Sequence, residues 1–94
     1  MTTREQYIAK MTQQLDEISM SITEYENRAH QMQTDAAIAY RDGLFQLRQQ
    51  LKLTQEKLEA LKSSSSNRWD HLVAETERVR DVFVDSFQYF KKHL

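Results

Sequence analysis

The side chains that could bind a metal ion or transfer protons are few and widely spaced in this sequence. The three histidines, His30, His71 and His93, include no pair at the i, i+4 spacing that places two imidazoles on one helix face. Glu26 and His30 have this spacing, but a di-iron helical bundle needs two Glu-x-x-His motifs, and the sequence contains none. We therefore expect no metal site, and we interpret Glu26 and His30 as a solvated helix flank.

The candidate nucleophiles and acids also lack a catalytic arrangement. The four serines at residues 63–66 have no Gly-x-Ser-x-Gly elbow and no marked base, so a turn is the simpler interpretation. Acidic residues at positions 75–85 alternate with Arg78 and Arg80, which is typical of a self-paired helix surface. With one glycine and no cysteine, the chain has neither a phosphate-binding glycine loop nor a thiolate nucleophile. We predict a protein that is not an enzyme and has no cofactor.

The composition is typical of long helices. The 94 residues include no proline and one glycine, 29% are charged, and the formal net charge is −1. This balance gives no electrostatic signal for nucleic acid. Residues 1–6 lack the apolar core of a signal peptide, and no window approaches the roughly eighteen-residue apolar run of a membrane-spanning helix. We expect one all-α domain over residues 1–94, cytoplasmic, with neither nucleic acid nor membrane as its favoured partner.

One apolar seam organises the first two thirds of the chain. Its steps alternate between three and four residues, which is the repeat of a coiled coil. Near Tyr40 the steps become four, four and three, a stutter that relaxes a supercoil without ending the helix. Because neither glycine nor proline interrupts residues 3–42, we predict one continuous helix over about residues 4–62, beginning at a Thr3–Gln6 capping box. The seam positions predicted to form an oligomer interface are Ile8, Met11, Leu15, Ile18, Ile22, Tyr25, Ala29, Met32 and Ala36.

A shorter second helix is predicted over about residues 67–93. The serine run at residues 63–66 provides the turn, and aromatic and aliphatic residues then recur at helical spacing. This pattern predicts an antiparallel helical hairpin with one shared core. Its predicted core residues are Leu44, Leu47, Leu51, Leu58, Leu61, Trp69, Leu72, Val79, Phe83, Phe87 and Phe90.

The two predicted arms differ in length. At 1.5 Å per residue the first helix spans on the order of 85 Å and the second on the order of 40 Å, so residues 8–32 would have no cover within the chain. A homodimer or higher homo-oligomer with antiparallel long helices would supply it. Residues 1–35 carry a net charge of −3 and residues 36–62 one of +2, which favours this orientation. The alternative is a closed monomeric three-helix bundle that turns near residues 31–35.

The aromatic end of the second helix leaves another function open. The aromatic residues at this end lie beside two lysines, a combination that could anchor an amphipathic helix in a lipid surface. They are Phe83, Phe87, Tyr89 and Phe90, beside Lys91 and Lys92. The acidic residues of the same helix oppose this, and the phase of the phenylalanines suits a bundle core. Peripheral lipid binding is therefore the alternative to protein association.

Several segments of the sequence are similar to those of a known family. The segments are Tyr7-Ile8-Ala9-Lys10-Met11, Gln14-Leu15-Asp16-Glu17, residues 36–40 with Leu44 and Leu47, Lys57-Leu58-Glu59-Ala60-Leu61-Lys62, and Trp69-Asp70-His71-Leu72 after the small-residue turn. They resemble small bacterial coiled-coil proteins described as stress-response proteins, over nearly the whole chain. The resemblance implies a bacterial cytoplasmic helical hairpin with no catalytic residues and a stress-related or protein-interaction role, with an unknown protein partner possible.

Overall fold

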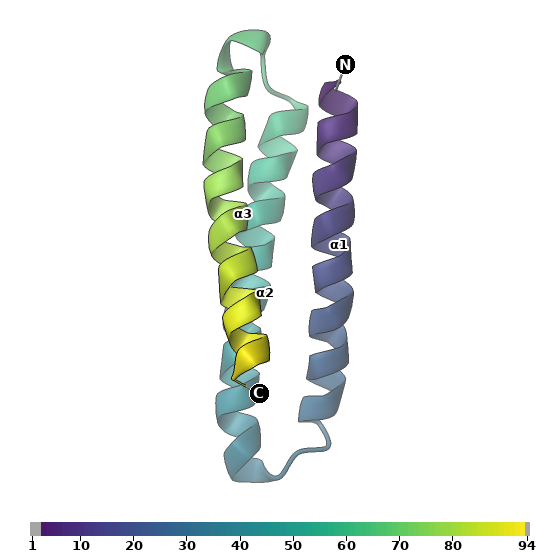
Figure 1. The fold of residues 1–94 in the computed structure, drawn as a ribbon, viewed down its shortest axis with the longest axis vertical. Helices are drawn as coiled ribbons and strands as arrows, with labels where there is room; N and C mark the ends of the chain where they lie inside the picture. Colours follow the sequence, from purple (N-terminus) through teal and green to yellow (C-terminus); the bar gives the residue numbers. More distant parts are fainter. Residues whose placement is uncertain (1–2, 94) are drawn as a thin grey trace.

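The computed structural model describes residues 3–93, which form three helices packed side by side (Figure 1). They are α1 (Arg4–Ala29), α2 (Thr34–Lys62) and α3 (Trp69–Lys92), and the short 3-10 helix η1 (Ser66–Arg68) precedes α3. Successive helices are antiparallel, so the N-terminus lies at the same end as the α2–α3 turn. The molecule measures 51 × 20 × 18 Å. The all-α prediction is confirmed, and the predicted second helix corresponds to α3.

The first predicted helix is not continuous, and this part of the prediction is wrong. The chain turns between His30 and Gln33, although this segment contains neither glycine nor proline and no non-glycine residue within 3–93 has a positive φ. The amide of Gln31 donates to the carbonyl of Arg28 (3.0 Å), which tightens the end of α1. The turn lets the apolar face of α1 pack against its own chain, and burying that face outweighs the helical hydrogen bonds lost at the turn. The predicted alternative, a closed three-helix bundle, is the arrangement observed.

The residues predicted to join two chains lie largely in the core of one chain. Met11, Leu15, Ile22 and Ala29 are buried, and the neighbouring Ile8, Ile18 and Tyr25 pack against the core from its border. Met32 is half-buried and Ala36 is exposed. Most of these residues therefore pack within one chain, which corrects the prediction that they lie between two chains. An additional contact between copies stays a prediction.

Ala37 is buried where the seam predicted Ala36. The turn at residues 30–33 interrupts the helical phase, so α2 presents the next residue to the core. The prediction of Ala36 extended the heptad phase of the first helix past the turn, where that phase no longer applies.

The predicted hairpin core is mostly observed as such. The leucines of α2 and the inner phenylalanines of α3 are buried, whereas Trp69, Leu72 and Phe90 pack partly buried against them and Val79 is half-buried. Thr54, also in α2, is fully buried, and its hydroxyl donates to the carbonyl of Gln50 (2.8 Å). The buried members of the cluster are Met11, Leu15, Ile22, Ala29, Leu44, Leu47, Leu51, Leu58, Leu61, Phe83 and Phe87.

The helix ends differ in how strongly the local sequence marks them. Thr3 and Gln6 form the predicted capping box, in which the Gln6 amide donates to Thr3 Oγ1 (3.1 Å) and the Thr3 amide donates to Gln6 Oε1 (3.0 Å). The predicted serine turn is also present, with Ser64 Oγ donating to the carbonyl of Leu61 (2.9 Å). At the start of α2, Gln33 is extended and makes no side-chain capping bond with any residue in the described range.

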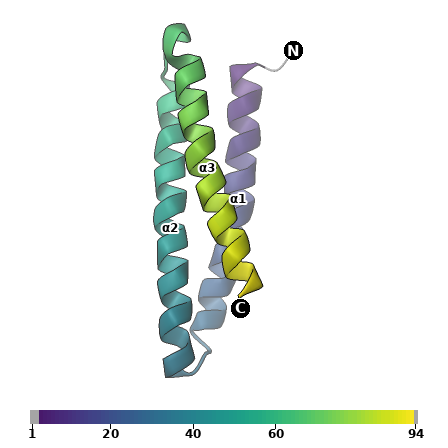
Figure 2. The same cartoon turned by 60° about the vertical axis from the view of Figure 1, so that its left-hand side comes forward.

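The helix α2 packs closely against both neighbours, while α1 and α3 meet through their side chains. Towards its C-terminus α3 lies over α1 (Figure 2). There the Phe90 ring packs against Tyr25 and Tyr40, with ring centroids 5.5 and 5.2 Å apart. Tyr7 and Trp69 make a similar contact at the opposite end, at 5.9 Å. Aromatic contacts therefore close both ends of the bundle.

Candidate functional site

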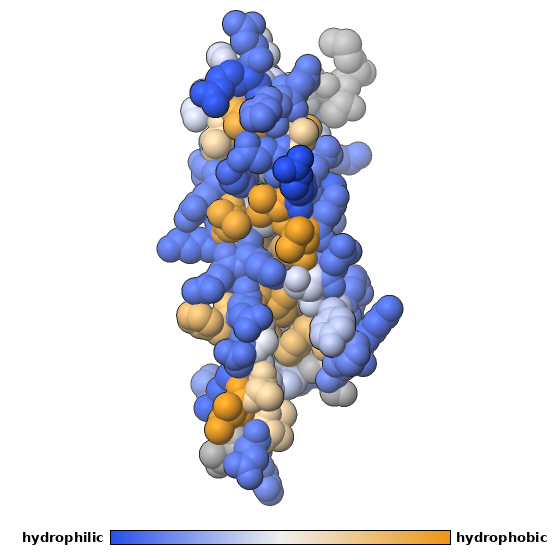
Figure 3. Space-filling view, turned by 90° about the vertical axis from the view of Figure 1, so that its left-hand side faces the viewer, coloured by the Kyte–Doolittle hydropathy of each residue, from blue (hydrophilic) through white to orange (hydrophobic). Residues whose placement is uncertain are grey.

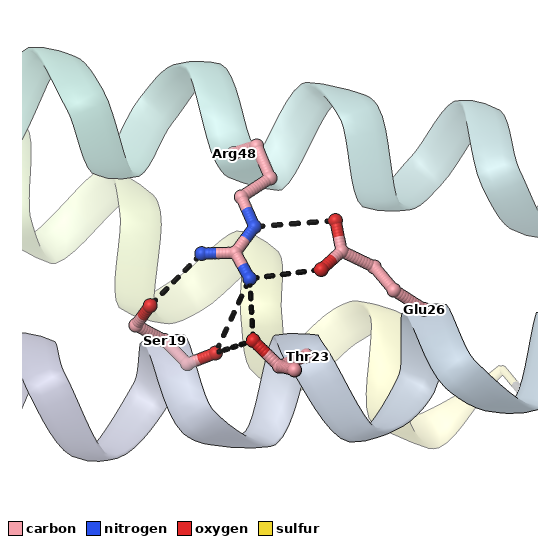
Figure 4. A network of polar contacts seen from close by, with 4 residues as sticks. All are labelled: Ser19, Thr23, Glu26 and Arg48. Carbon is pink, nitrogen blue, oxygen red and sulfur yellow. Dashed lines mark hydrogen bonds and ion pairs between the residues drawn. The ribbon is translucent and has the colours of Figure 1, made fainter.

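A polar network centred on Arg48 of α2 holds α1 in place (Figure 4). Its guanidinium donates from Nη2 to Glu26 Oε1 (2.8 Å) and from Nε to Glu26 Oε2 (3.2 Å), a bidentate ion pair. The same group donates from Nη1 to Ser19 Oγ (2.8 Å) and from Nη2 to Thr23 Oγ1 (2.7 Å). Because Ser19, Thr23 and Glu26 stand at steps of four and three along α1, one guanidinium spans two turns of that helix. We call these four residues the Arg48 clasp; it fixes the register of α1 on α2.

The sequence predicted a solvated flank for two residues of this region, and the prediction was wrong for one of them. His30 is exposed, as expected. The Glu26 side chain is 38% exposed and turns towards Arg48 instead. The polar residues at positions 19, 23 and 26 were the available signal, since they line one edge of the α1 seam. Their partner becomes identifiable only once α2 is known to fold back beside α1.

A second set of contacts attaches the first turn of α1 to the α2–α3 turn. The guanidinium of Arg4 lies over the Trp69 ring, 4.5 Å from its centroid, and donates from Nη1 to the carbonyl of Ser64 (3.1 Å). The Tyr7 ring packs against Trp69, and the Tyr7 hydroxyl is buried. Burial raises the pKa of Tyr7 above its ordinary value, and the negative charge of Glu77 raises this pKa further.

The opposite end of α1 has its own attachment. Arg41 Nη2 donates to the carbonyl of Ala29 (3.3 Å), close to the C-terminus of the helix, where a positive charge is favourable. Arg4 and Arg41 therefore contact the two ends of α1, and Arg48 contacts its C-terminal half.

The phenylalanines considered as a lipid anchor point into the bundle. Phe83 is fully buried and Phe87 is 5% exposed, so both form core in this arrangement. Phe90 packs over Gly43, where an added Cβ would lie 3.1 Å from the ring. The exposed aromatic residue of this helix is Tyr89, which stacks on His93 with ring centroids 4.0 Å apart. The closed bundle therefore buries the inner phenylalanines of the predicted anchor, whereas Tyr89 remains exposed.

A groove of about 660 Å³ runs between the start of α2 and the end of α3. Tyr40 and Phe90 form its aromatic wall, and Gln46 and Asp85 belong to its polar lining. Gln50 Oε1 is buried at this groove and has no hydrogen-bond partner among the residues that the structure describes. The groove offers space and one unpaired acceptor, without a set of groups that converge on a particular ligand.

The outer face of α2 carries large apolar side chains in contact with solvent. Ile38 is 65% exposed, Phe45 60% and Leu53 46%. Their spacing of seven and eight residues keeps them on one side of the helix, opposite the buried leucines. We call these three residues the α2 stripe. Figure 3, which looks onto α2 and α3, shows apolar side chains interrupting a largely hydrophilic surface, including a patch at the end of the molecule where α2 begins.

The remaining chemical candidates are surface groups. Glu75 pairs with Lys57 across the α2–α3 interface, and His71 Nε2 lies 3.6 Å from Glu75 Oε2. Hydrogen bonding to Lys57 and its positive charge lower the pKa of Glu75. Within residues 3–93, no three histidine, aspartate or glutamate side chains gather into a group that could hold a metal ion.

None of the helices, over the residues described, has an apolar stretch of the length needed to cross a bilayer. Comparisons of the chain with protein-family models, with curated proteins and with solved structures found no match.

Proposed function

We propose that this protein is a non-enzymatic helical bundle that works by self-association and protein interaction, with a stress-related role in the bacterial cytoplasm. The resemblance of the sequence to small bacterial stress-response proteins motivates the role and the location. The observation that carries the proposal is the α2 stripe. It leaves Ile38, Phe45 and Leu53 in water along one helix of a bundle whose core is already closed. Large apolar side chains exposed along one helix face offer a surface that a partner can cover.

The spacing of the stripe favours a second copy of the same chain as its partner. A two-fold contact requires a patch that is complementary to itself. The steps on either side of Phe45 are seven and eight residues, and hence nearly equal. A two-fold axis at Phe45 therefore brings this ring against its equivalent and places Ile38 of one copy near Leu53 of the other.

The test compares two charged substitutions at exposed apolar residues. Phe45→Glu places a carboxylate at the centre of the stripe, whereas Met20→Glu, at a residue 68% exposed on α1, is the matched control. We expect light scattering from micromolar to millimolar concentration to give a larger average mass for the wild type and for Met20→Glu than for Phe45→Glu, in which association through the stripe is lost. A wild type that remains monomeric, or equal loss in both variants, would contradict the proposal.

A lipid surface is the second candidate for the same stripe. Arg41 and Lys52, four residues before and seven after Phe45, lie along one edge of it and could contact lipid phosphates. Flotation with neutral and with anionic vesicles tests this candidate. If the stripe binds lipid, the wild type floats with anionic vesicles and Phe45→Glu does not. A wild type that floats with neither kind of vesicle excludes lipid binding.

A further inference from the structure

The turn between α1 and α2 contains little that opposes a helix. His30 already has helical dihedral angles (φ −65°, ψ −20°), and Gln33 is extended (φ −69°, ψ 154°). The segment from 29 to 36 has neither glycine nor proline. Of these two residues, Gln33 is the one whose ψ must rotate towards the helical value for α1 and α2 to join.

The apolar pattern runs through the same turn at helical spacing. Ala29, Met32 and Ala36 continue the seam at steps of three and four, although Met32 is half-buried and Ala36 exposed in the closed bundle. A joined helix would bring these two residues into line with the buried face of α1. The sequence is thus compatible with two arrangements of the same segments, a closed turn and one helix over residues 4–62.

The contacts that hold α1 can be supplied by either copy of the chain. Arg48 donates hydrogen bonds to Ser19, Thr23 and Glu26 of α1. Arg4 of α1 lies over the ring of Trp69. All are side-chain contacts between α1 and the α2–α3 pair. A second copy presents an identical α2–α3 pair, so exchanging α1 preserves these contacts and alters the turn alone.

We propose that α1 exchanges between two copies of the protein. In the exchanged dimer each turn straightens into one helix of about 59 residues, on the order of 88 Å long. The α1 segment of each copy then packs on α2 and α3 of the other, with the two joined helices antiparallel. The partner is a second copy of this chain and the surface is the buried face of α1. This exchange does not depend on the α2 stripe.

Position 34 allows the two arrangements to be shifted in opposite directions. Thr34 is the first residue of α2, where proline is well tolerated because the N–H has no partner within the helix, and Gln33 already has the extended conformation that a following proline requires. In a joined helix the same proline lies in the interior. Thr34→Pro should therefore lower the association constant of the exchanged dimer by at least about a hundredfold. Gln33→Ala with Thr34→Ala should raise it about tenfold, since alanine has a higher helix propensity than glutamine or threonine and each exchanged dimer contains two joined helices.

Two complementary variants identify the exchange directly. Glu26→Arg and Arg48→Glu each place like charges in the clasp of a closed monomer. In an exchanged heterodimer, however, one clasp pairs the two introduced side chains, which are opposite in charge, and the other pairs the native Glu26 with the native Arg48. The two variants, unfolded and refolded together, should give a mixed dimer that neither forms alone, detected by native mass spectrometry.

These experiments are carried out with and without Phe45→Glu, which separates the exchange from association through the α2 stripe. A mixed dimer that persists with Phe45→Glu supports the exchange even if the proposed function fails. Absence of the mixed dimer would overturn the exchange. So would a Phe45→Glu protein whose dimerisation is unchanged when Thr34→Pro is added. Neither result would affect the proposed function, which has its own test.

Discussion

At the scale of single residues, arginines attach α1 to the rest of the bundle. Arg48 fixes the register of α1 on α2 because its planar guanidinium binds the Glu26 carboxylate and two hydroxyl groups of α1 at fixed separations. Its side chain is 32% exposed, so water screens the pair with Glu26 and the net stabilisation is modest. The clasp therefore contributes more to the specificity of packing than to the total free energy of folding.

A double-mutant cycle on Glu26→Gln and Arg48→Met measures this contribution. We expect a coupling free energy of about 1 kcal/mol, because the pair is bidentate and half-buried. The control cycle uses Glu59→Gln and Lys62→Met, whose side chains are 69% and 46% exposed on α2. Its coupling should not exceed about 0.5 kcal/mol in the same urea denaturation. Equal couplings in the two cycles would refute the role given to Arg48.

Glu75 gives the interface of α2 and α3 a dependence on pH. Its pKa is lower in the folded protein than its ordinary value of 4.5, because Lys57 favours the carboxylate. The contribution to stability is thus present above pH 4.5 and is lost as the pH falls through the lowered pKa. Urea denaturation of the wild type and of Glu75→Gln should give stabilities that converge as the pH is lowered through this range. Curves that stay parallel would contradict the assignment.

At the scale of elements, the start of α2 is only weakly marked by its local sequence. The capping box of α1 and the serine turn before α3 are written into local residue types, whereas Gln33 occupies the N-cap of α2 without capping it through its side chain, among the residues described. The α1–α2 turn exists because the faces of the two helices bury one another. This is also the reason that the same turn is the hinge of the proposed exchange.

Replacing Gln33 by a capping residue should strengthen the closed turn. Gln33 is extended, as an N-cap residue must be, so Gln33→Asp can accept a hydrogen bond from the first turn of α2 and place a negative charge at its N-terminus. We expect the free energy of unfolding to rise by about 1 kcal/mol in thermal or urea denaturation. Gln31→Asp, two residues earlier, is the control and should not stabilise the protein. A stabilisation of the same size in both variants would count against capping.

At the scale of the whole molecule, three antiparallel helices enclose one core and leave an apolar stripe outside it. The aromatic contacts of Tyr7 with Trp69 and of Tyr25 with Phe90 close the two ends of the bundle between α1 and α3. The two proposed contacts between copies use different surfaces, the exposed face of α2 and the buried face of α1. If both operate, they link copies beyond the dimer, because two independent two-fold contacts on one chain need not close on themselves.

The sequence by itself determined the all-α class, the start of α1, the serine turn and most of the core. These features follow from local chemistry: a capping box, a poor helix former repeated four times, and apolar residues at helical spacing. Helical spacing also places Thr54 on the face of α2 that carries Leu51 and Leu58, and its buried hydroxyl donates to the carbonyl of Gln50.

Only the tertiary structure decided that the chain turns after Ala29 and that Glu26 meets Arg48. Residues 30–33 are locally compatible with a helix, and the free energy that favours the turn comes from burying Met11, Leu15 and Ile22 against helices distant in sequence. Pairing across 22 residues likewise has no local signature, because it depends on which faces the turn brings together. Local residue types mark where helices can form, and the balance between intrachain and interchain burial decides where one of them ends.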